Sequence, residues 1–124
     1  MSAGSQVSAA MVAAIDALAL VDGIYDGPPA RAAYPYAVID AGNESDWSHK
    51  SGDGREVLVA LTLWDDVPER LAGIADTVER AVTAIAAVPG WSIASLRFLR
   101  RRTVRDVAGP WAMAIDFRAR LLAV

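Results

Sequence analysis

The chain has 124 residues and a mass of 13.1 kDa, which suits one compact domain over residues 1–124. With 54% hydrophobic and 22% charged residues, it is too apolar for a disordered tail. The absence of cysteine excludes disulfides, thiolate catalysis and thiolate metal sites. A net charge of −3 at pH 7 argues against general nucleic-acid binding, although a local basic patch could still bind a nucleic acid.

Neither of the two uncharged stretches predicts export or membrane insertion. Residues 1–15 lack the basic start and the leucine-rich centre of a secretory signal. Residues 81–96 are interrupted by Pro89-Gly90 and are shorter than the roughly 20 residues that a spanning helix needs. We therefore expect a soluble protein without a membrane partner.

The first third of the chain predicts a helix followed by a rigid connection. Over residues 5–20, apolar side chains recur at three- and four-residue steps, and Asp22-Gly23 ends the pattern. Ile24-Tyr25 is predicted to be a short extended piece. A rigid connection then runs through Gly27-Pro28-Pro29 to about Ala33, because two prolines after a glycine cannot continue a regular element.

Two strands with a polar segment between them are predicted next. The first strand covers residues 34–41, and residues 43–55 form a long exposed loop or hairpin tip. Residues 56–64 are apolar on both alternating sets, which predicts a central strand that is covered on both faces.

The clearest predicted element is a second helix. Its start is predicted at Asp66-Val67-Pro68-Glu69, where Asp66 caps the free N–H groups and Glu69 occupies the third position of a capping box. An apolar stripe then runs from Leu71 to Ile85, and we expect the helix to end before Pro89-Gly90.

Two strands, residues 92–104 and 111–122, complete the pattern, with a turn at residues 105–110. The last strand alternates between apolar and polar residues, which is typical of a strand with one buried face and one solvent-exposed face. The order α-β-β-α-β-β predicts an α+β fold, with a mostly antiparallel four-to-five-stranded sheet and two helices packed on it.

The residues that usually carry catalysis are sparse. His49 is the only histidine, so a catalytic triad or a multi-histidine metal site would need residues from another subunit, and we interpret it as an exposed loop residue. Asp65-Asp66 invites a two-carboxylate interpretation, but we favour the helix cap. Gly52-Asp53-Gly54 lacks the lysine and the glycine spacing of phosphate-binding loops, so we predict a turn. We predict no catalytic residue, cofactor or metal.

One cluster of arginines is the exception in an acidic chain. Consecutive residues of a strand point to alternate faces, so the three adjacent arginines cannot share one flat DNA-binding surface. At least one of them should meet a carboxylate of this chain or of a neighbouring subunit. A solvated hairpin end, a protein interface and a phosphate contact stay open as interpretations. The cluster consists of Arg97, Arg100, Arg101, Arg102 and Arg105.

The polar segment carries one large aromatic residue, Trp47, without apolar neighbours. An exposed aromatic side chain on a hydrophilic loop is a common interface anchor, and the alternative is that Trp47 folds back over the sheet. We place Trp47, His49 and Lys50 with the arginine cluster as candidate interface residues.

Several segments, in order along the chain, resemble the tail-completion (tail terminator) family of long-tailed phages and gene transfer agents. The first is Ile-Tyr-Asp-Gly-Pro-Pro from Ile24, followed by Tyr-Pro-Tyr-Ala-Val-Ile from Tyr34. Asp-Trp-Ser-His-Lys-Ser-Gly begins at Asp46, and Leu-Thr-Leu-Trp ends at Trp64. Later segments agree, namely Leu96–Phe98, Arg105-Asp106 and Phe117-Arg118-Ala119. The resemblance covers nearly the whole chain, and its specificity comes from the series.

The resemblance implies a structural protein without catalytic residues. Such proteins form a ring, usually a homo-hexamer, at the head-proximal end of the tail tube, where they stop tube polymerisation. The implied partners are further copies of the chain, the tail tube protein and the neck or head-tail connector proteins, and DNA passes through the lumen without specific binding. The implied location is the tail of a virion or particle, assembled in the bacterial cytoplasm.

On this interpretation the segment 43–55 reaches toward the tube or a neighbouring subunit, and the arginines pair with acidic groups across the ring. Two alternatives stay open. One is another neck or head-tail connector component. The other is a stand-alone small-molecule-binding or hydrolytic α+β domain.

Overall fold

The computed structural model describes residues 2–27, 29–105, 107 and 109–124. Pro28 of the predicted rigid connection and Asp106 and Ala108 of the predicted turn lie outside the described residues. The elements are α1 (Ala3–Ala17), β1 (Gly23–Asp26), β2 (Tyr36–Asp46), β3 (Gly54–Asp65), α2 (Pro68–Thr83), β4 (Ala87–Val88), β5 (Trp91–Arg105) and β6 (Trp111–Ala123).

The strands form one six-stranded sheet in the order β1-β2-β3-β6-β5-β4. The α+β prediction is confirmed, but the strand number and element order were wrong. The sheet is also mixed rather than antiparallel, because β1 runs parallel to β2. The reason for the error is length: β1 has four residues and β4 has two, too few for a periodic hydrophobic pattern.

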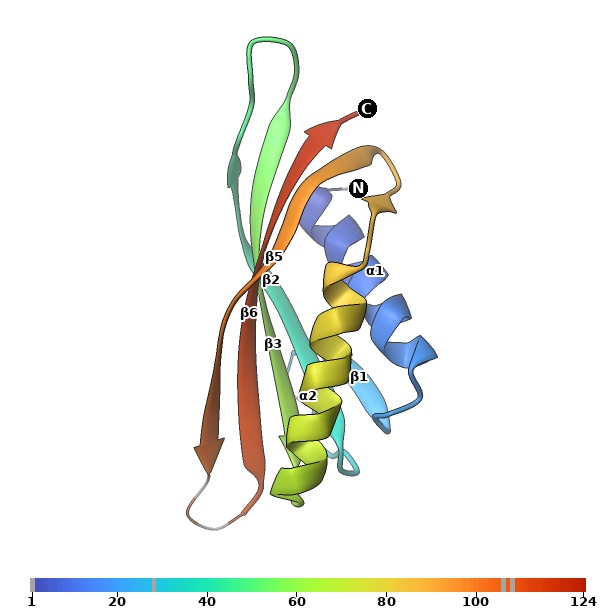
Figure 1. The fold of residues 1–124 in the computed structure, drawn as a ribbon, viewed down its shortest axis with the longest axis vertical. Helices are drawn as coiled ribbons and strands as arrows, with labels where there is room; N and C mark the ends of the chain where they lie inside the picture. Colours follow the sequence, from blue (N-terminus) through green and yellow to red (C-terminus); the bar gives the residue numbers. More distant parts are fainter. Residues whose placement is uncertain (1, 28, 106, 108) are drawn as a thin grey trace.

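Both helices pack on the same face of the sheet, side by side (Figure 1). Their apolar stripes meet the inward side chains of β2, β3 and β6 in one core, which explains why the sheet binds both helices on a single side. The largest fully buried side chains of this core are Val7, Met11, Ile15, Val57, Val59, Leu61, Leu63, Leu71, Val78, Ile115, Phe117 and Leu121.

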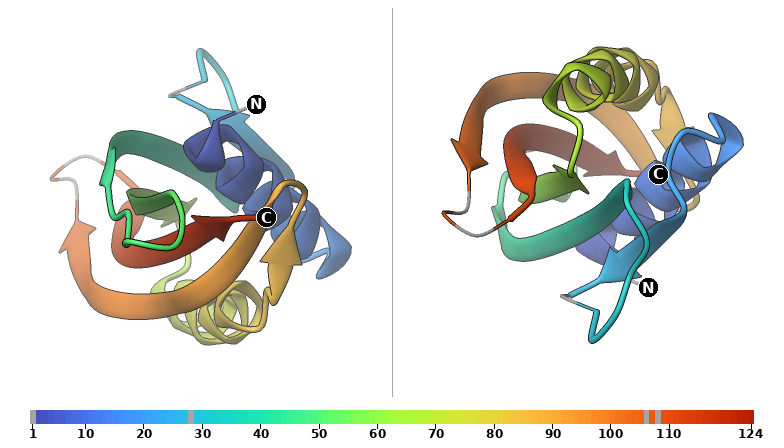
Figure 2. Two further views of the ribbon diagram at one scale, coloured as in Figure 1. Left: turned by 90° about the horizontal axis from the view of Figure 1, so that it is seen from above. Right: turned by 90° about the horizontal axis from the view of Figure 1, so that it is seen from below.

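The prediction that β3 is covered on both faces was wrong. Val57, Val59, Leu61 and Leu63 are buried under the helices, whereas Leu58 on the other set is 38% exposed. We call the face turned away from the helices the outer face. Among the described residues, no helix or strand packs over it (Figure 2). An apolar pattern predicts that a face of the strand is buried. It does not show whether that face is buried by the same chain or by another protein.

The helix boundaries also differ from the prediction. Helix α1 begins two residues earlier than expected, where Ser2 accepts a hydrogen bond from the Ser5 N–H at 3.1 Å. Helix α2 has Val67 at its N-cap position, without a side-chain cap, so the assignment of Asp66 as the cap was wrong. The carboxylate of Asp65, rather than that of Asp66, lies at the start of α2 and accepts a hydrogen bond from the Val67 N–H at 3.3 Å.

Two strand pairs extend the molecule at opposite ends of its long axis (Figure 1). The β2–β3 hairpin is longer than predicted, because β2 continues to Asp46 and β3 begins at Gly54, which leaves residues 47–53 as the tip. At the other end, β5 ends at Arg105 and β6 begins at Trp111. Within the described ranges no helix is both long and apolar enough to cross a membrane.

Candidate assembly interface

The tip of the β2–β3 hairpin is an ordered turn held by backbone hydrogen bonds. The Trp47 N–H donates to the Gly54 carbonyl oxygen at 2.9 Å, and the His49 N–H donates to the Gly52 carbonyl oxygen at 2.8 Å. The Ser48 hydroxyl accepts from the Gly54 N–H at 3.1 Å and donates to the Asp46 carboxylate at 2.6 Å. These hydrogen bonds hold the backbone of the tip in one conformation, and the side chains of His49 and Lys50 are exposed on it.

Trp47 is half-buried and combines the two arrangements considered from the sequence. Its ring meets the His49 ring edge-on, with the ring centroids 4.5 Å apart. The guanidinium carbon of Arg120, on β6, lies 5.4 Å from the Trp47 ring centroid. Arg120 also forms an ion pair with Glu56 on the outer face, at 2.9 Å, so the contact with Arg120 holds Trp47 at the end of that face. Part of the Trp47 side chain remains exposed to solvent.

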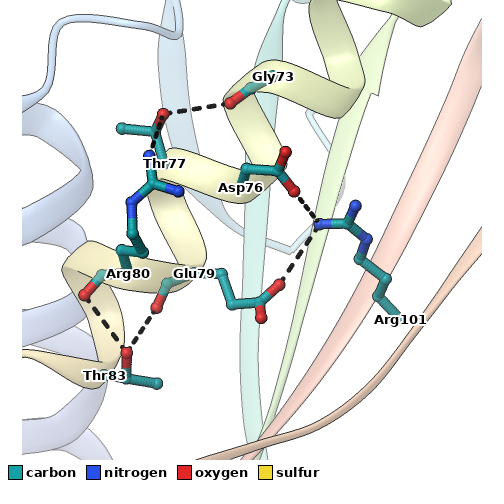
Figure 3. Close-up of polar contacts among 7 residues, drawn as sticks. All are labelled: Gly73, Asp76, Thr77, Glu79, Arg80, Thr83 and Arg101. Atoms are coloured by element: carbon teal, nitrogen blue, oxygen red, sulfur yellow. Dashed lines mark hydrogen bonds and ion pairs between the residues drawn. The ribbon is translucent and has the colours of Figure 1, made fainter.

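The arginines of β5 point to both faces of the sheet, as their spacing predicts. Arg100 pairs on the outer face with Asp116 of β6 at 2.6 Å. Arg101 reaches helix α2, where it lies 2.8 Å from Asp76 and 3.4 Å from Glu79 (Figure 3). The prediction that at least one of them meets a carboxylate is confirmed, and all three carboxylate partners belong to the same chain.

The other three arginines are placed differently. Arg97 stands opposite Arg118 in the β5–β6 pairing, and Arg102 stands opposite Ala114. The guanidinium of Arg105 lies 5.2 Å from the centroid of the Trp111 ring. Arg97, Arg102 and Arg105 form no ion pair with the residues that the structure describes.

The structure thus separates the eight candidate residues into two groups. Trp47, His49 and Lys50 lie at the hairpin tip, and Arg105 lies at the far end of β5, at the opposite end of the molecule (Figure 1). The remaining arginines are distributed along β5 between these ends. The candidates therefore describe two surfaces rather than one site.

Aromatic residues that sequence reasoning did not select form a cluster at the start of β2. Tyr36 stacks on Tyr34 and on Trp64, with ring centroids 5.8 and 6.2 Å apart, and meets Tyr25 edge-on at 6.0 Å. Burial raises the pKa of Tyr36, and the neighbouring Tyr34 and Tyr25 hydroxyls raise it further. The Tyr-Pro-Tyr sequence and the position of Trp64 on the outward set of β3 are the signals that point to this cluster.

The adjacent carboxylates Asp65 and Asp66 occupy different environments but do not form an acid-base pair. Asp65 is fully buried, and its hydrogen bonds from Arg70 hold its pKa below the ordinary value. Asp66 is exposed and lies 3.5 Å from the same guanidinium. Both are thus engaged in holding the start of α2, which is a structural task.

The outer face carries a shallow hollow of about 350 Å³ between β2, β3, β5 and β6. Leu58, Ala60 and Leu99 supply apolar surface there, and the Arg100–Asp116 ion pair borders it. Over the described part of the chain, no three histidine, aspartate or glutamate side chains gather closely enough to hold a metal ion. The chemistry available on this face is that of a mixed apolar and charged contact surface.

Comparisons with known proteins identify the fold and the family. A chain from the virion of a native gene transfer agent particle is similar, with a TM-score of 0.76, 24% sequence identity, and coverage of 94% of this chain and 98% of that one. The bacteriophage SPP1 gp17 protein is similar with a TM-score of 0.64, 18% identity, and coverage of 98% and 91%. Comparison with curated proteins gives no significant match. The family model described as tail completion protein gp17 matches residues 5–122, and the chain therefore belongs to this family of phage-type tail proteins.

Proposed function

We propose that the chain is a tail terminator that forms a ring at the head-proximal end of a tail tube, stops tube polymerisation and joins the tail to the head. Membership of the tail completion family supports this role. The structural observation that carries it is the outer face, which four neighbouring strands build and which no described helix or strand of the same chain covers. The role is structural rather than enzymatic.

The chemistry of the outer face suits protein contacts. Leu58 is 38% exposed and Leu99 is 45% exposed, and both line the hollow between the strands. Exposed apolar side chains gathered in one place and bordered by charged groups are characteristic of interaction surfaces. A face of this kind gains stability when a neighbouring subunit or the tube covers it.

The two extended ends of the subunit suit a ring with a different partner on each side. The hairpin tip with Trp47 and the β5–β6 end with Arg105 lie far apart, so each can contact a different protein (Figure 1). The proposed partners are further copies of the chain, six in a closed ring, together with the tail tube protein and the neck proteins. The proposed location is the tail of a virion or particle, after assembly in the bacterial cytoplasm.

The charge of the chain is compatible with DNA passing through the centre of the ring. The net charge is −3, and the carboxylates of Asp116, Asp76 and Glu79 already engage Arg100 and Arg101. These two arginines attract phosphates less than free ones do, so with the negative net charge DNA passage is favoured provided that Arg97, Arg102 and Arg105 face a neighbouring subunit rather than the lumen.

The proposal is tested by measuring the mass of the purified protein by light scattering, alone and with tubes polymerised from the cognate tube protein. Electron microscopy then compares tubes formed with and without it. We expect a ring-sized complex on one tube end and an arrest of tube growth. A protein that stays monomeric, binds no tube and leaves tube length unchanged contradicts the proposal, whereas binding to neck proteins without capping indicates a connector.

A further inference from the structure

The two halves of the sheet carry opposite charge. Strands β1 and β2 contain four carboxylates and no basic residue, namely Asp26, Asp40, Glu44 and Asp46. Strand β5 contains five arginines and no acidic residue, namely Arg97, Arg100, Arg101, Arg102 and Arg105. Because β2 and β5 lie on opposite sides of the central β3–β6 pair, one side of the sheet is acidic and the other is basic.

Both strands also have open edges over their charged parts. Strand β1 pairs with residues 36–39 of β2, which leaves β2 without a strand partner on that side from Asp40 to Asp46. Strand β4 pairs only with Trp91 and Ser92, which leaves the rest of β5 open as far as Arg105. An open edge presents unpaired backbone N–H and C=O groups and can add a strand from another chain.

A groove lies beside the open edge of β2, beyond the end of β1. Gly27, at φ 94°, takes the chain out of the sheet directly after Asp26, so β1 does not continue along β2. The groove measures about 330 Å³, and Asp26, Asp40 and Glu44 line it together with the first turns of α1. Glu44 already accepts a hydrogen bond from the Gly4 N–H at 2.7 Å and lies 4.0 Å from Arg55, so Asp26 and Asp40 supply the negative charge that the groove offers to an extended, basic segment.

Each half of the sheet also contains neighbouring residues of the same charge that form no ion pair within the described part of the chain. Arg97 stands directly opposite Arg118, and like charges in this position on a sheet destabilise the pairing. Asp26 and Asp40 line the same groove, and within the described residues neither forms an ion pair. Opposite charges from outside the chain relieve both situations.

From these observations we infer that the open edge of β5 in one copy of the chain docks on the open edge of β2 in the next copy. The inference rests on the proposed ring and names the surfaces that build it. Charge selects this pairing, because two β5 edges repel each other and so do two β2 edges. A contact between two different surfaces is heterologous, and repeated head-to-tail contacts of this kind close into a ring when the rotation allows.

Because the chain contains no cysteine, engineered cysteines test the contact without background. The test variant combines Asn43→Cys on β2 with Val104→Cys on β5, two exposed positions whose replacement leaves the charge unchanged. The two single variants and a variant combining Asn43→Cys with Ala13→Cys on the exposed side of α1 are the controls. Each protein is bound to tubes of the cognate tube protein, treated with a short bis-maleimide, and separated by denaturing gel electrophoresis.

We expect the double edge variant to give a ladder of cross-linked species up to the ring size, and the single variants and the α1 control to stay monomeric. The ladder should weaken in about 1 M salt, where the Debye length falls to about 3 Å. Dimers of either single variant mean that an edge pairs with its own copy, which overturns the inference. Capped tubes without a ladder overturn the edge contact and leave the terminator role intact, whereas loss of both capping and ladder overturns both.

Discussion

Arg70 donates two hydrogen bonds to the buried carboxylate of Asp65, from Nε to Oδ2 at 2.7 Å and from Nη2 to Oδ1 at 2.6 Å. Asp65 is the last residue of β3 and Arg70 lies in the first turn of α2, so the pair fixes the direction in which the helix leaves the sheet. Charge-assisted contacts of this bidentate kind are stronger than neutral hydrogen bonds. The pair therefore stabilises the junction between β3 and α2.

Asp65→Ala should lower the free energy of unfolding by about 1.5–3 kcal/mol, because it removes the charge-assisted hydrogen bonds to Arg70 and the acceptor of the Val67 N–H, while the half-exposed guanidinium stays solvated. The neighbouring change Asp66→Ala is the matched control. Asp66 is exposed and makes only one contact with Arg70, at 3.5 Å, so its loss should cost less than about 0.5 kcal/mol. Urea denaturation of the three proteins measures the difference, and equal effects of the two substitutions contradict this role of Asp65.

Stability should also fall in acid because of the same pair. The Arg70 hydrogen bonds keep the pKa of Asp65 below its ordinary value in the folded state, despite the opposite effect of burial. In the unfolded chain the carboxyl returns to its ordinary pKa of about 4. The stabilisation is thus fully present above that pH and is lost as the pH falls through the folded pKa. Unfolding free energies measured from pH 7 to pH 2 should converge for the native protein and Asp65→Asn, and a pH-independent difference refutes the assignment.

Gly54→Ala should destabilise the root of the β2–β3 hairpin. A Cβ atom at Gly54 would overlap the carbonyl group of Trp47 and approach the Leu121 carbonyl oxygen to 3.0 Å. Both are backbone atoms: Trp47 is tied to Gly54 by the hydrogen bond from its N–H, and Leu121 belongs to β6. They cannot move aside without breaking these hydrogen bonds, and we expect a cost of about 1–3 kcal/mol. Gly52→Ala is the control, because a Cβ there meets no atom within 4 Å. Thermal unfolding of both variants tests the contrast, and a Gly54→Ala protein as stable as Gly52→Ala would show the approach to be relaxed.

Trp47→Ala should leave the fold intact and weaken assembly. The side chain is half-buried and its contacts are with His49 and Arg120 at the surface, so we expect a loss of stability of about 1 kcal/mol or less. The measurements are circular dichroism and the capping of cognate tubes. Tyr34→Ala, which removes another partly exposed aromatic ring at a distance from the tip, serves as the control. If Trp47→Ala unfolds the isolated domain, the tryptophan belongs to the core and the interface role fails.

Replacing Arg100 and Arg102 with glutamate should block ring formation or docking. The double change reverses two charges on the basic edge and breaks the Arg100–Asp116 pair, whose own contribution to folding is small because the Arg100 side chain is 81% exposed. Replacing Arg31 and Arg80 with glutamate changes the net charge equally at exposed positions away from β5. Analytical ultracentrifugation and tube capping compare the two, and normal assembly of the β5 variant would falsify the interface role of these arginines.

Sequence reasoning located the long elements because their periodicity is a local property. The apolar stripe from Leu71 to Val82 predicts α2, and the alternation from Trp111 to Leu121 predicts β6, since each depends on the spacing of near neighbours in the chain. The same local logic gave the alternate directions of Arg100 and Arg101. The series of segments along the chain gave the tail completion family.

Tertiary structure alone decided how these elements share their surfaces. Whether Leu58 on β3 is covered depends on where both helices pack, and whether Asp65 or Asp66 serves α2 depends on which carboxylate Arg70 can reach from its turn of the helix. The parallel β1–β2 pairing and the open edges of β2 and β5 likewise result from contacts between residues far apart in the chain. Composition and periodicity determine which surfaces avoid water, but only the packed chain determines which of them it buries itself and which remain for a partner.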